Sequence, residues 1–125
     1  MLFDTDVLIW AIRGNTKAAG AIDRDVEREI SVVNYIELLQ GARNKNEIKM
    51  LRSFIIDLGF SIHPLSAEIG YRASVYIEEY GLSTGLVLAD ALVAATAVEF
   101  QKPLLTGNAK HFRSISELQL KAFRP

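Results

Sequence analysis

Short apolar runs bounded by turn residues alternate along this chain with longer segments of helical periodicity. The apolar runs predict strands at residues 2–4, 30–33, 60–63, 104–106 and 118–123, with a turn at 13–15. The periodic segments predict helices at residues 17–28, 34–42, 46–58 and 86–100, and another that Ser66 caps and that ends before a loop at 81–85. Because this alternation is typical of crossover connections, we expect an α/β fold in three layers, a mostly parallel sheet flanked by helices.

The size and composition of the chain narrow the class of protein. Its 125 residues, half of them hydrophobic, suffice for one sizeable core, so we expect a single domain over residues 1–125. The longest nearly unbroken apolar run, residues 86–98, contains Asp90 and Thr96 and is shorter than the roughly 20 residues of a bilayer span. The first residues lack the pattern of a secretory signal. We therefore expect a soluble protein with no membrane partner.

Cysteine content and charge limit the chemistry that is available. The chain has no cysteine, which excludes disulfides, thiolate zinc sites and thiol nucleophiles and fits a cytoplasmic location. Metal ligands would have to be oxygen or imidazole groups. The formal net charge is -1 at pH 7, so contact with a phosphate backbone would need local basic patches or bound metal.

Acidic residues follow the first two predicted strands. Asp4 ends the first strand, Asp6 lies just beyond it, and Glu37 lies near the start of the helix after the second strand. The carboxyl ends of parallel strands meet at one edge of a sheet, where open α/β sheets bind ligands. A structural interpretation also stays open, with the two aspartates as turn caps and Glu37 as the reciprocal capping partner of Asn34.

Asp90 interrupts an otherwise apolar helical pattern. A carboxylate in such a place loses much of its hydration, which costs several kcal/mol unless a partner compensates. A hydroxyl or amide neighbour, a helix that starts later, or a cation shared with other acids would each offset this cost. Asn108 follows the strand that ends at Thr106 and can present a carbonyl oxygen at the same edge. Oxygen donors of this kind suit Mg²⁺ or Mn²⁺ better than zinc.

With these residues identified, the chain resembles the PIN domain family and, within it, the VapC toxins of type II toxin-antitoxin systems. Five blocks over the whole chain carry the resemblance: LFDTDVLIW at 2–10, SVVNYIELLQGA at 31–42, DALVAATA at 90–97, LTGNAKHF at 105–112 and LKAFRP at 120–125. The family's three acids fall on Asp4, Glu37 and Asp90. Its variable fourth acid falls on Asn108, and a position that is often Asn or Ser falls on Asp6.

The resemblance implies an endoribonuclease that uses Mg²⁺, with Mn²⁺ as a substitute, and leaves a 5′-phosphate and a 3′-hydroxyl. Asp4 and Asp90 would anchor the metal, and Glu37 would bind a second ion or orient the attacking water. Asn108 would complete the catalytic set with Asp4, Glu37 and Asp90, and the supporting residues would be Asp6 and Thr106. The resemblance also implies a homodimer and a cognate VapB-like antitoxin whose tail enters the acidic groove.

Two positions depart from the family pattern. Asn108 is an amide where some relatives have a carboxylate, which puts a permanently filled second metal site in doubt. Gly107 stands where many relatives carry a larger and often basic residue, so one phosphate contact is missing. The remaining candidates for contact with the RNA backbone, for which a solvated helix surface is the alternative interpretation, are Arg13, Lys17, Arg43, Lys45, Lys49, Lys110 and Arg113.

Three other functions stay open at this point. A phosphoacceptor receiver module has a similar length and a Lys-Pro step such as Lys102 and Pro103, but it needs an acceptor aspartate after its third strand. A metal-free ribonuclease would use His63 and His111 as acid and base. A PIN fold kept only for RNA binding would lack catalysis, and the fold alone does not exclude it.

Overall fold

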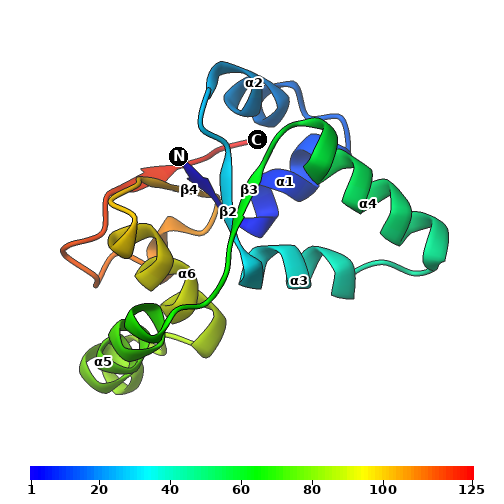
Figure 1. The fold of residues 1–125 in the computed structure, drawn as a ribbon. Coiled ribbons are helices and arrows are strands. Elements are labelled where there is room, and N and C mark those ends of the chain that lie inside the picture. Colours follow the sequence, from blue (N-terminus) through cyan, green and yellow to red (C-terminus); the bar gives the residue numbers. More distant parts are fainter.

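A five-stranded sheet with the order β3-β2-β1-β4-β5 forms the centre of the structure, a computed structural model that describes all residues 1–125 (Figure 1). The strands are β1 (Leu2–Phe3), β2 (Glu29–Ser31), β3 (Ser61–His63), β4 (Leu104–Thr106) and β5 (Leu120–Ala122). The helices are α1 (Thr5–Ile12), α2 (Thr16–Arg24), α3 (Val32–Gln40), α4 (Lys45–Asp57), α5 (Ala67–Thr84), α6 (Leu88–Glu99) and the 3-10 helix η1 (Ala109–His111). All strand pairs are parallel, so every strand ends at the same edge of the sheet.

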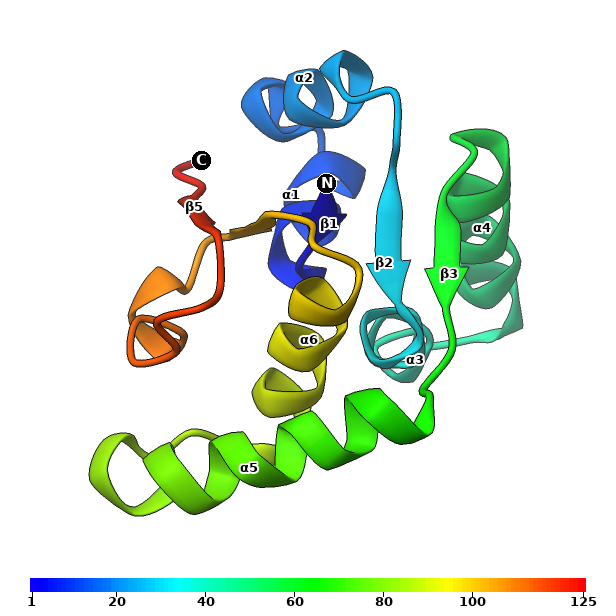
Figure 2. The same ribbon diagram turned by 60° about the vertical axis from the view of Figure 1, so that its left-hand side comes forward.

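Helices cover both faces of the sheet, which confirms the predicted three-layer α/β architecture (Figure 2). Successive strand residues point to opposite faces. Leu2 and Leu104 therefore pack in a core with α5 and α6, whereas Phe3, Ile30 and Leu105 pack in a second core with α1, α2 and α4. The two cores hold the short strands in place, although no strand is longer than three residues.

Helix α1 is the one long element that the hydrophobic pattern missed. We expected a strand through Asp4, but β1 ends at Phe3, and Asp4 is the N-cap of α1, accepting a hydrogen bond from the backbone N–H of Thr5 (2.9 Å). Val7 and Leu8 are fully buried against the sheet. A helix that is apolar on most sides shows no 3.6-residue alternation, so its sequence resembles that of a buried strand.

Several other boundaries shift by a few residues. Helix α2 ends at Arg24 instead of residue 28, and the Arg28 side chain donates to the carbonyl oxygens of Ile22 in the last turn of α2 (2.8 Å) and of Leu58, the C-cap of α4 (2.8 Å). Strand β5 is shorter than predicted, and η1 was not predicted. The ends of helices and strands are set by such contacts between distant segments, which local patterns do not encode.

Helix α5 continues through residues 81–84, which we expected to form a loop. The predicted cap Ser66 is confirmed, since its hydroxyl accepts the N–H of Ile69 (3.2 Å). The helix ends at Gly85, which has a left-handed φ of 70°, and not at Gly81. Consequently α6 starts at Leu88, two residues later than predicted. No helix in the structure has the length and apolar character needed to cross a bilayer.

Gly70, inside α5, and Gly85, the C-cap of α5, give a matched test of this boundary. Gly85→Ala places a side chain in the left-handed region and is expected to lower the free energy of unfolding by about 1 kcal/mol. Gly70→Ala fills open space inside the helix and is expected to raise it by about 1 kcal/mol. Urea denaturation followed by circular dichroism measures both changes. Equal effects of the two substitutions would contradict the assignment of Gly85 as the cap.

Candidate active site

The predicted site residues lie after the three central strands of the sheet. Asp4 directly follows β1, Glu37 lies on the second turn of α3 after β2, and Asn108 follows β4. Asp90 lies in the first turn of α6, and the negative charges of Asp4 and Glu37 act on it. Strands β2, β1 and β4 are neighbours in the sheet, so the fold brings these segments to one edge, as the sequence predicts.

Asp4 is buried and is held by three separate segments. Its Oδ1 accepts hydrogen bonds from the backbone N–H of Thr5 (2.9 Å) and from Nδ2 of Asn34 (3.1 Å). Its Oδ2 accepts a hydrogen bond from the hydroxyl of Thr106 (2.7 Å). Both Asn34 and Thr106 are fully buried. Three donors from different directions thus hold the Asp4 carboxyl group in a fixed orientation.

Asn34 is a site residue that sequence analysis assigned to a different role. Helix α3 starts at Val32, so the reciprocal capping pair is Ser31 with Asn34. This pair lies three residues earlier than the predicted pair of Asn34 with Glu37. The side-chain Oδ1 of Asn34 accepts the N–H of Ser31 (3.3 Å). Its Nδ2 therefore remains available to donate to Asp4 and to the Thr5 hydroxyl (3.0 Å). The Ser at position 31 was the signal for the earlier cap.

Glu37 is therefore free of the capping role. It is an exposed residue, and its Oε1 accepts a hydrogen bond from the hydroxyl of Thr5 (2.6 Å). Because Thr5 in turn accepts from Asn34, a chain of hydrogen bonds links Glu37 to Asp4. The two carboxylates are thus connected through one hydroxyl and one amide.

Asp90 lies in the first turn of α6. The helix starts later than predicted, which is one of the interpretations that the sequence left open for this residue. The partial positive charge of a helix N-terminus stabilises a carboxylate there. Burial nevertheless raises the pKa of Asp90, and the charge of Asp4 raises it further, while His111 lowers it. His111 Nδ1 lies 3.5 Å from Asp90 Oδ2, and both residues line a cavity of about 230 Å³. Burial and the neighbouring acids thus destabilise the charged form of Asp90, although the helix N-terminus favours it.

The oxygen donors at this edge of the sheet are of the kind that a hydrated divalent metal ion takes as ligands. No group of three or more His, Cys, Asp or Glu side chains is arranged to enclose an ion. Mg²⁺, however, keeps several waters and is bound through only one or two carboxylates. Asp6 Oδ1 is buried without a hydrogen-bond partner, and burial together with the charge of Asp4 raises the pKa of Asp6. The uncompensated negative charge and the oxygen donors fit a hydrated hard cation.

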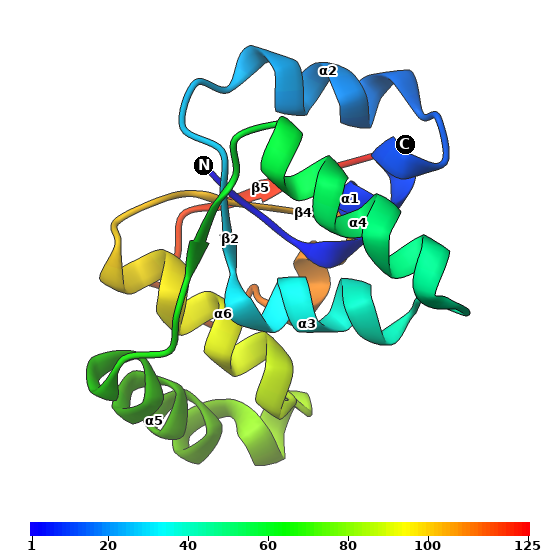
Figure 3. The same cartoon turned by 45° about the vertical axis from the view of Figure 1, so that its right-hand side comes forward.

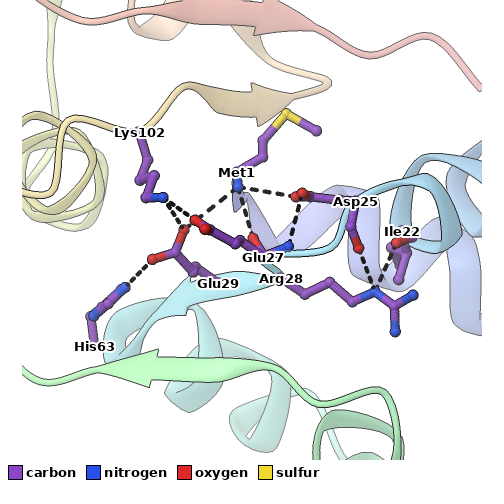
Figure 4. Close-up of polar contacts among 8 residues, drawn as sticks. All are labelled: Met1, Ile22, Asp25, Glu27, Arg28, Glu29, His63 and Lys102. Carbon is purple, nitrogen blue, oxygen red and sulfur yellow. Dashed lines mark hydrogen bonds and ion pairs between the residues drawn. The ribbon is translucent and has the colours of Figure 1, made fainter.

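The two histidines do not form an acid–base pair. Nε2 of His63 lies 2.8 Å from Glu29 Oε1, and its ring stacks on Phe100 with the ring centroids 3.8 Å apart. Figure 4 shows the contact between His63 and Glu29, which Lys102 also contacts (3.6 Å). His111 instead contacts Asp90. Because the two imidazoles belong to separate sites, the structure argues against a metal-free mechanism that uses both.

The structure also excludes a receiver module. Strand β3 ends at His63 and is followed by Pro64, so no aspartate occupies the acceptor position. Asp57, the nearest acid before this strand, is the last residue of α4. The sheet order differs as well from the order 2-1-3-4-5 of receiver-like folds.

Comparison with known proteins agrees with this geometry. Residues 1–118 match the model of the PIN domain family. Ribonuclease VapC10 of Mycobacterium tuberculosis is 32% identical over 123 residues, which cover 95% of this chain and 90% of the relative. Ribonuclease VapC of Rickettsia bellii is 27% identical over 125 residues, which cover 96% of this chain and 93% of the relative.

Solved structures show the same fold. A toxin-antitoxin complex from Klebsiella pneumoniae contains a chain with a TM-score of 0.78 and 30% identity, with 94% of this chain and 93% of that chain covered. VapBC2 of Rickettsia felis, bound to a promoter DNA fragment, gives a TM-score of 0.82 at 20% identity, with 98% of both chains covered. The present chain belongs to the PIN domain family and is of its VapC type.

The raised pKa of Asp90 predicts a pH-dependent difference in stability. The folded protein holds the Asp90 proton more tightly than the unfolded chain does, so the free energy of unfolding falls as pH rises from the ordinary pKa of 3.8 through the folded value. In EDTA, we expect Asp90→Asn to be more stable than the wild type above this window and to lose that advantage below it.

Thermal unfolding from about pH 3 to about pH 8, a range that extends below the ordinary pKa, measures this difference. The exposed Asp57→Asn serves as the control. A gap between the wild type and Asp90→Asn that does not change with pH would contradict the prediction.

Proposed function

We propose that this chain is a metal-dependent endoribonuclease and the toxin of a VapBC-like type II toxin-antitoxin pair. The observation that carries the proposal is the approach of Asp4, Glu37 and Asp90 from three segments to one edge of the sheet, where the charges of Asp4 and Glu37 act unfavourably on Asp90 and a bound cation would neutralise this repulsion. The relatives named as VapC ribonucleases support it. An RNA-processing or RNA-binding PIN protein without a toxin role is the alternative.

In this proposal Asp4 and Asp90 hold Mg²⁺, or Mn²⁺ in its place. When bound, the cation would lower the pKa of a water molecule and neutralise charge on the in-line transition state of phosphodiester hydrolysis. Thr106 and Asn34 keep Asp4 oriented toward the site. Glu37, oriented by Thr5, accepts a proton from the attacking water or binds a second ion. The products would carry a 5′-phosphate and a 3′-hydroxyl.

The RNA substrate would be single-stranded or looped, because helical RNA hides its base edges in a deep groove. The surface offers exposed cations for its backbone, since all seven basic candidates are exposed: Arg13, Lys17, Arg43, Lys45, Lys49, Lys110 and Arg113. Arg43 is paired with Glu47 (3.2 Å), which reduces its share in this role.

The first test is the cleavage of a single-stranded RNA in the presence of Mg²⁺. We expect Asp4→Asn and Asp90→Asn each to lower kcat at least about 100-fold, because each removes a charge that stabilises the transition state through the cation. EDTA should abolish cleavage, and Mn²⁺ should restore it. His63→Ala is the control that should retain activity. Cleavage that survives both EDTA and Asp90→Asn would contradict the proposal and favour a binding-only function.

An apolar groove beside Glu37 is the proposed site of the antitoxin. It has a volume of about 740 Å³ and is lined by residues of α1, α3 and α4, among them Ile9, Leu38 and Met50. Figure 3 shows how these three helices are arranged. Glu37 lies at its edge, so an apolar antitoxin segment that also carried a basic side chain would match both the groove and the acidic site. The solved VapBC and toxin-antitoxin complexes support a partner of this class.

Two exposed apolar residues of α4 test the groove. Met50→Glu places a charge in it, and Ile56→Glu places the same charge on α4 outside it. With a VapB-like protein encoded beside this gene, we expect Met50→Glu to weaken binding at least about 10-fold by calorimetry and Ile56→Glu to leave it unchanged. Equal affinities of the two variants would place the partner elsewhere.

Homodimerisation remains a proposal as well. The side chains of Leu82, Val87 and Leu88 are exposed around the junction of α5 and α6 and are candidate contacts between two copies. Light scattering coupled to size-exclusion chromatography measures the oligomeric state.

A further inference from the structure

Asp6 joins the first turn of α1 to the loop that follows β4. Its Oδ2 accepts hydrogen bonds from the backbone N–H of Gly107 (2.9 Å) and from Nδ2 of Asn108 (3.2 Å). The neighbouring Thr106 ties the same loop to Asp4, because its hydroxyl donates to Asp4 and accepts the N–H of Asn108 (3.0 Å). The loop is thus fastened to the start of α1 by a backbone and a side-chain contact at once.

The contact with Asp6 decides which way the Asn108 amide faces. A carboxylate only accepts hydrogen bonds, so Asn108 must direct its NH₂ group to Asp6. The backbone carbonyl oxygen of Asn108 accepts the N–H of His111 (2.9 Å), whereas its side-chain Oδ1 accepts no hydrogen bond from the protein. Asn108 therefore offers the site an acceptor oxygen and not a donor.

Gly107 is fitted to the Asp6 carboxylate. A Cβ atom at this position would lie 2.4 Å from Asp6 Oδ2 and 3.3 Å from its Cγ, which is too close for any side chain unless Asp6 moves. The φ of Gly107 is not in the left-handed region, which among the glycines is confined to Gly14, Gly59 and Gly85. Glycine is therefore required here for space and not for backbone conformation.

This arrangement has an energetic cost. Asp6 Oδ1 is buried with no hydrogen-bond partner, and the carboxylate lies within the influence of Asp4. A buried acceptor without a partner destabilises the folded state, because nothing replaces the hydration that it loses. Such costs are concentrated at functional sites, where the position of a group matters more than its contribution to stability.

We propose that Asp6 is a positioning residue that locks Gly107 and Asn108 against α1. The lock turns the side-chain Oδ1 of Asn108 toward the acidic site, where it would accept hydrogen bonds from the water shell of the cation. Position 107 is glycine because the Asp6 carboxylate fills the space of a side chain. The inference rests on the proposed ribonuclease function for its kinetic consequence, whereas the lock itself is a property of the free protein.

A double-mutant cycle in RNA cleavage tests the coupling. Asp6→Ser removes the lock, and Gly107→Ala displaces the carboxylate, so each is expected to lower kcat about 10-fold with KM for RNA unchanged. The smaller serine leaves room for the new Cβ atom. The double variant should therefore lose no more than either single variant, instead of the roughly 100-fold loss that independent sites would give. Asp6→Asn keeps an acceptor for the Gly107 N–H and should retain most of the activity.

Amide hydrogen exchange of Gly107, followed by NMR in the absence of RNA, tests the Asp6 lock independently of the proposed ribonuclease function. We expect exchange at least about 10-fold faster in Asp6→Ser than in the wild type, little change in Asp6→Asn and no change in the exposed Asp57→Asn control. Unchanged exchange in Asp6→Ser, or full additivity in the cycle, would overturn the lock. A wild type that cleaves no RNA would overturn the proposed function, and the exchange measurement would still decide on the lock.

Discussion

The carboxylate of Asp4 is the group on which the rest of the site depends. It accepts hydrogen bonds from the start of α1, from Asn34 on α3 and from Thr106 at the end of β4. These donors come from segments up to 102 residues apart in the sequence. Asp4 therefore both caps α1 and ties it to α3 and β4, and its negative charge acts on Asp6 and on Asp90. Asp4 is thus linked to each of the other acids, to Asp6 and Asp90 by its charge and to Glu37 through hydrogen bonds.

The remainder of the fold carries the cost of this concentration of charge. Two apolar cores on opposite faces of the sheet supply the stability that the acidic edge does not. At that edge, Asp6 keeps a buried oxygen without a partner, and Asp90 is partly buried beside other acids. A site in which carboxylates repel one another in the free protein is suited to bind a cation, because the cation removes the repulsion as well as forming bonds.

Local patterns predicted most elements but misplaced those whose ends depend on distant contacts. The amphipathic helices around Leu51 and Ile69 were recognised because one face is polar and the other is buried. Helix α1 was missed because most residues around Val7 and Leu8 are apolar, so the helix has no distinct polar face. Helix α5 passes through Gly81 because a single glycine costs only about 1 kcal/mol, which packing against α6 offsets.

The sequence by itself determined the α/β class, the order of the main elements and the placement of Asp4, Glu37 and Asn108 beyond strand ends, since strand ends and caps leave local signals. Only the tertiary structure decided that Asn34 supports Asp4 instead of pairing with Glu37, that His63 and His111 belong to different sites, and that Gly107 makes room for Asp6. These contacts join residues 21 or more positions apart, and periodicity over a few residues carries no information about them.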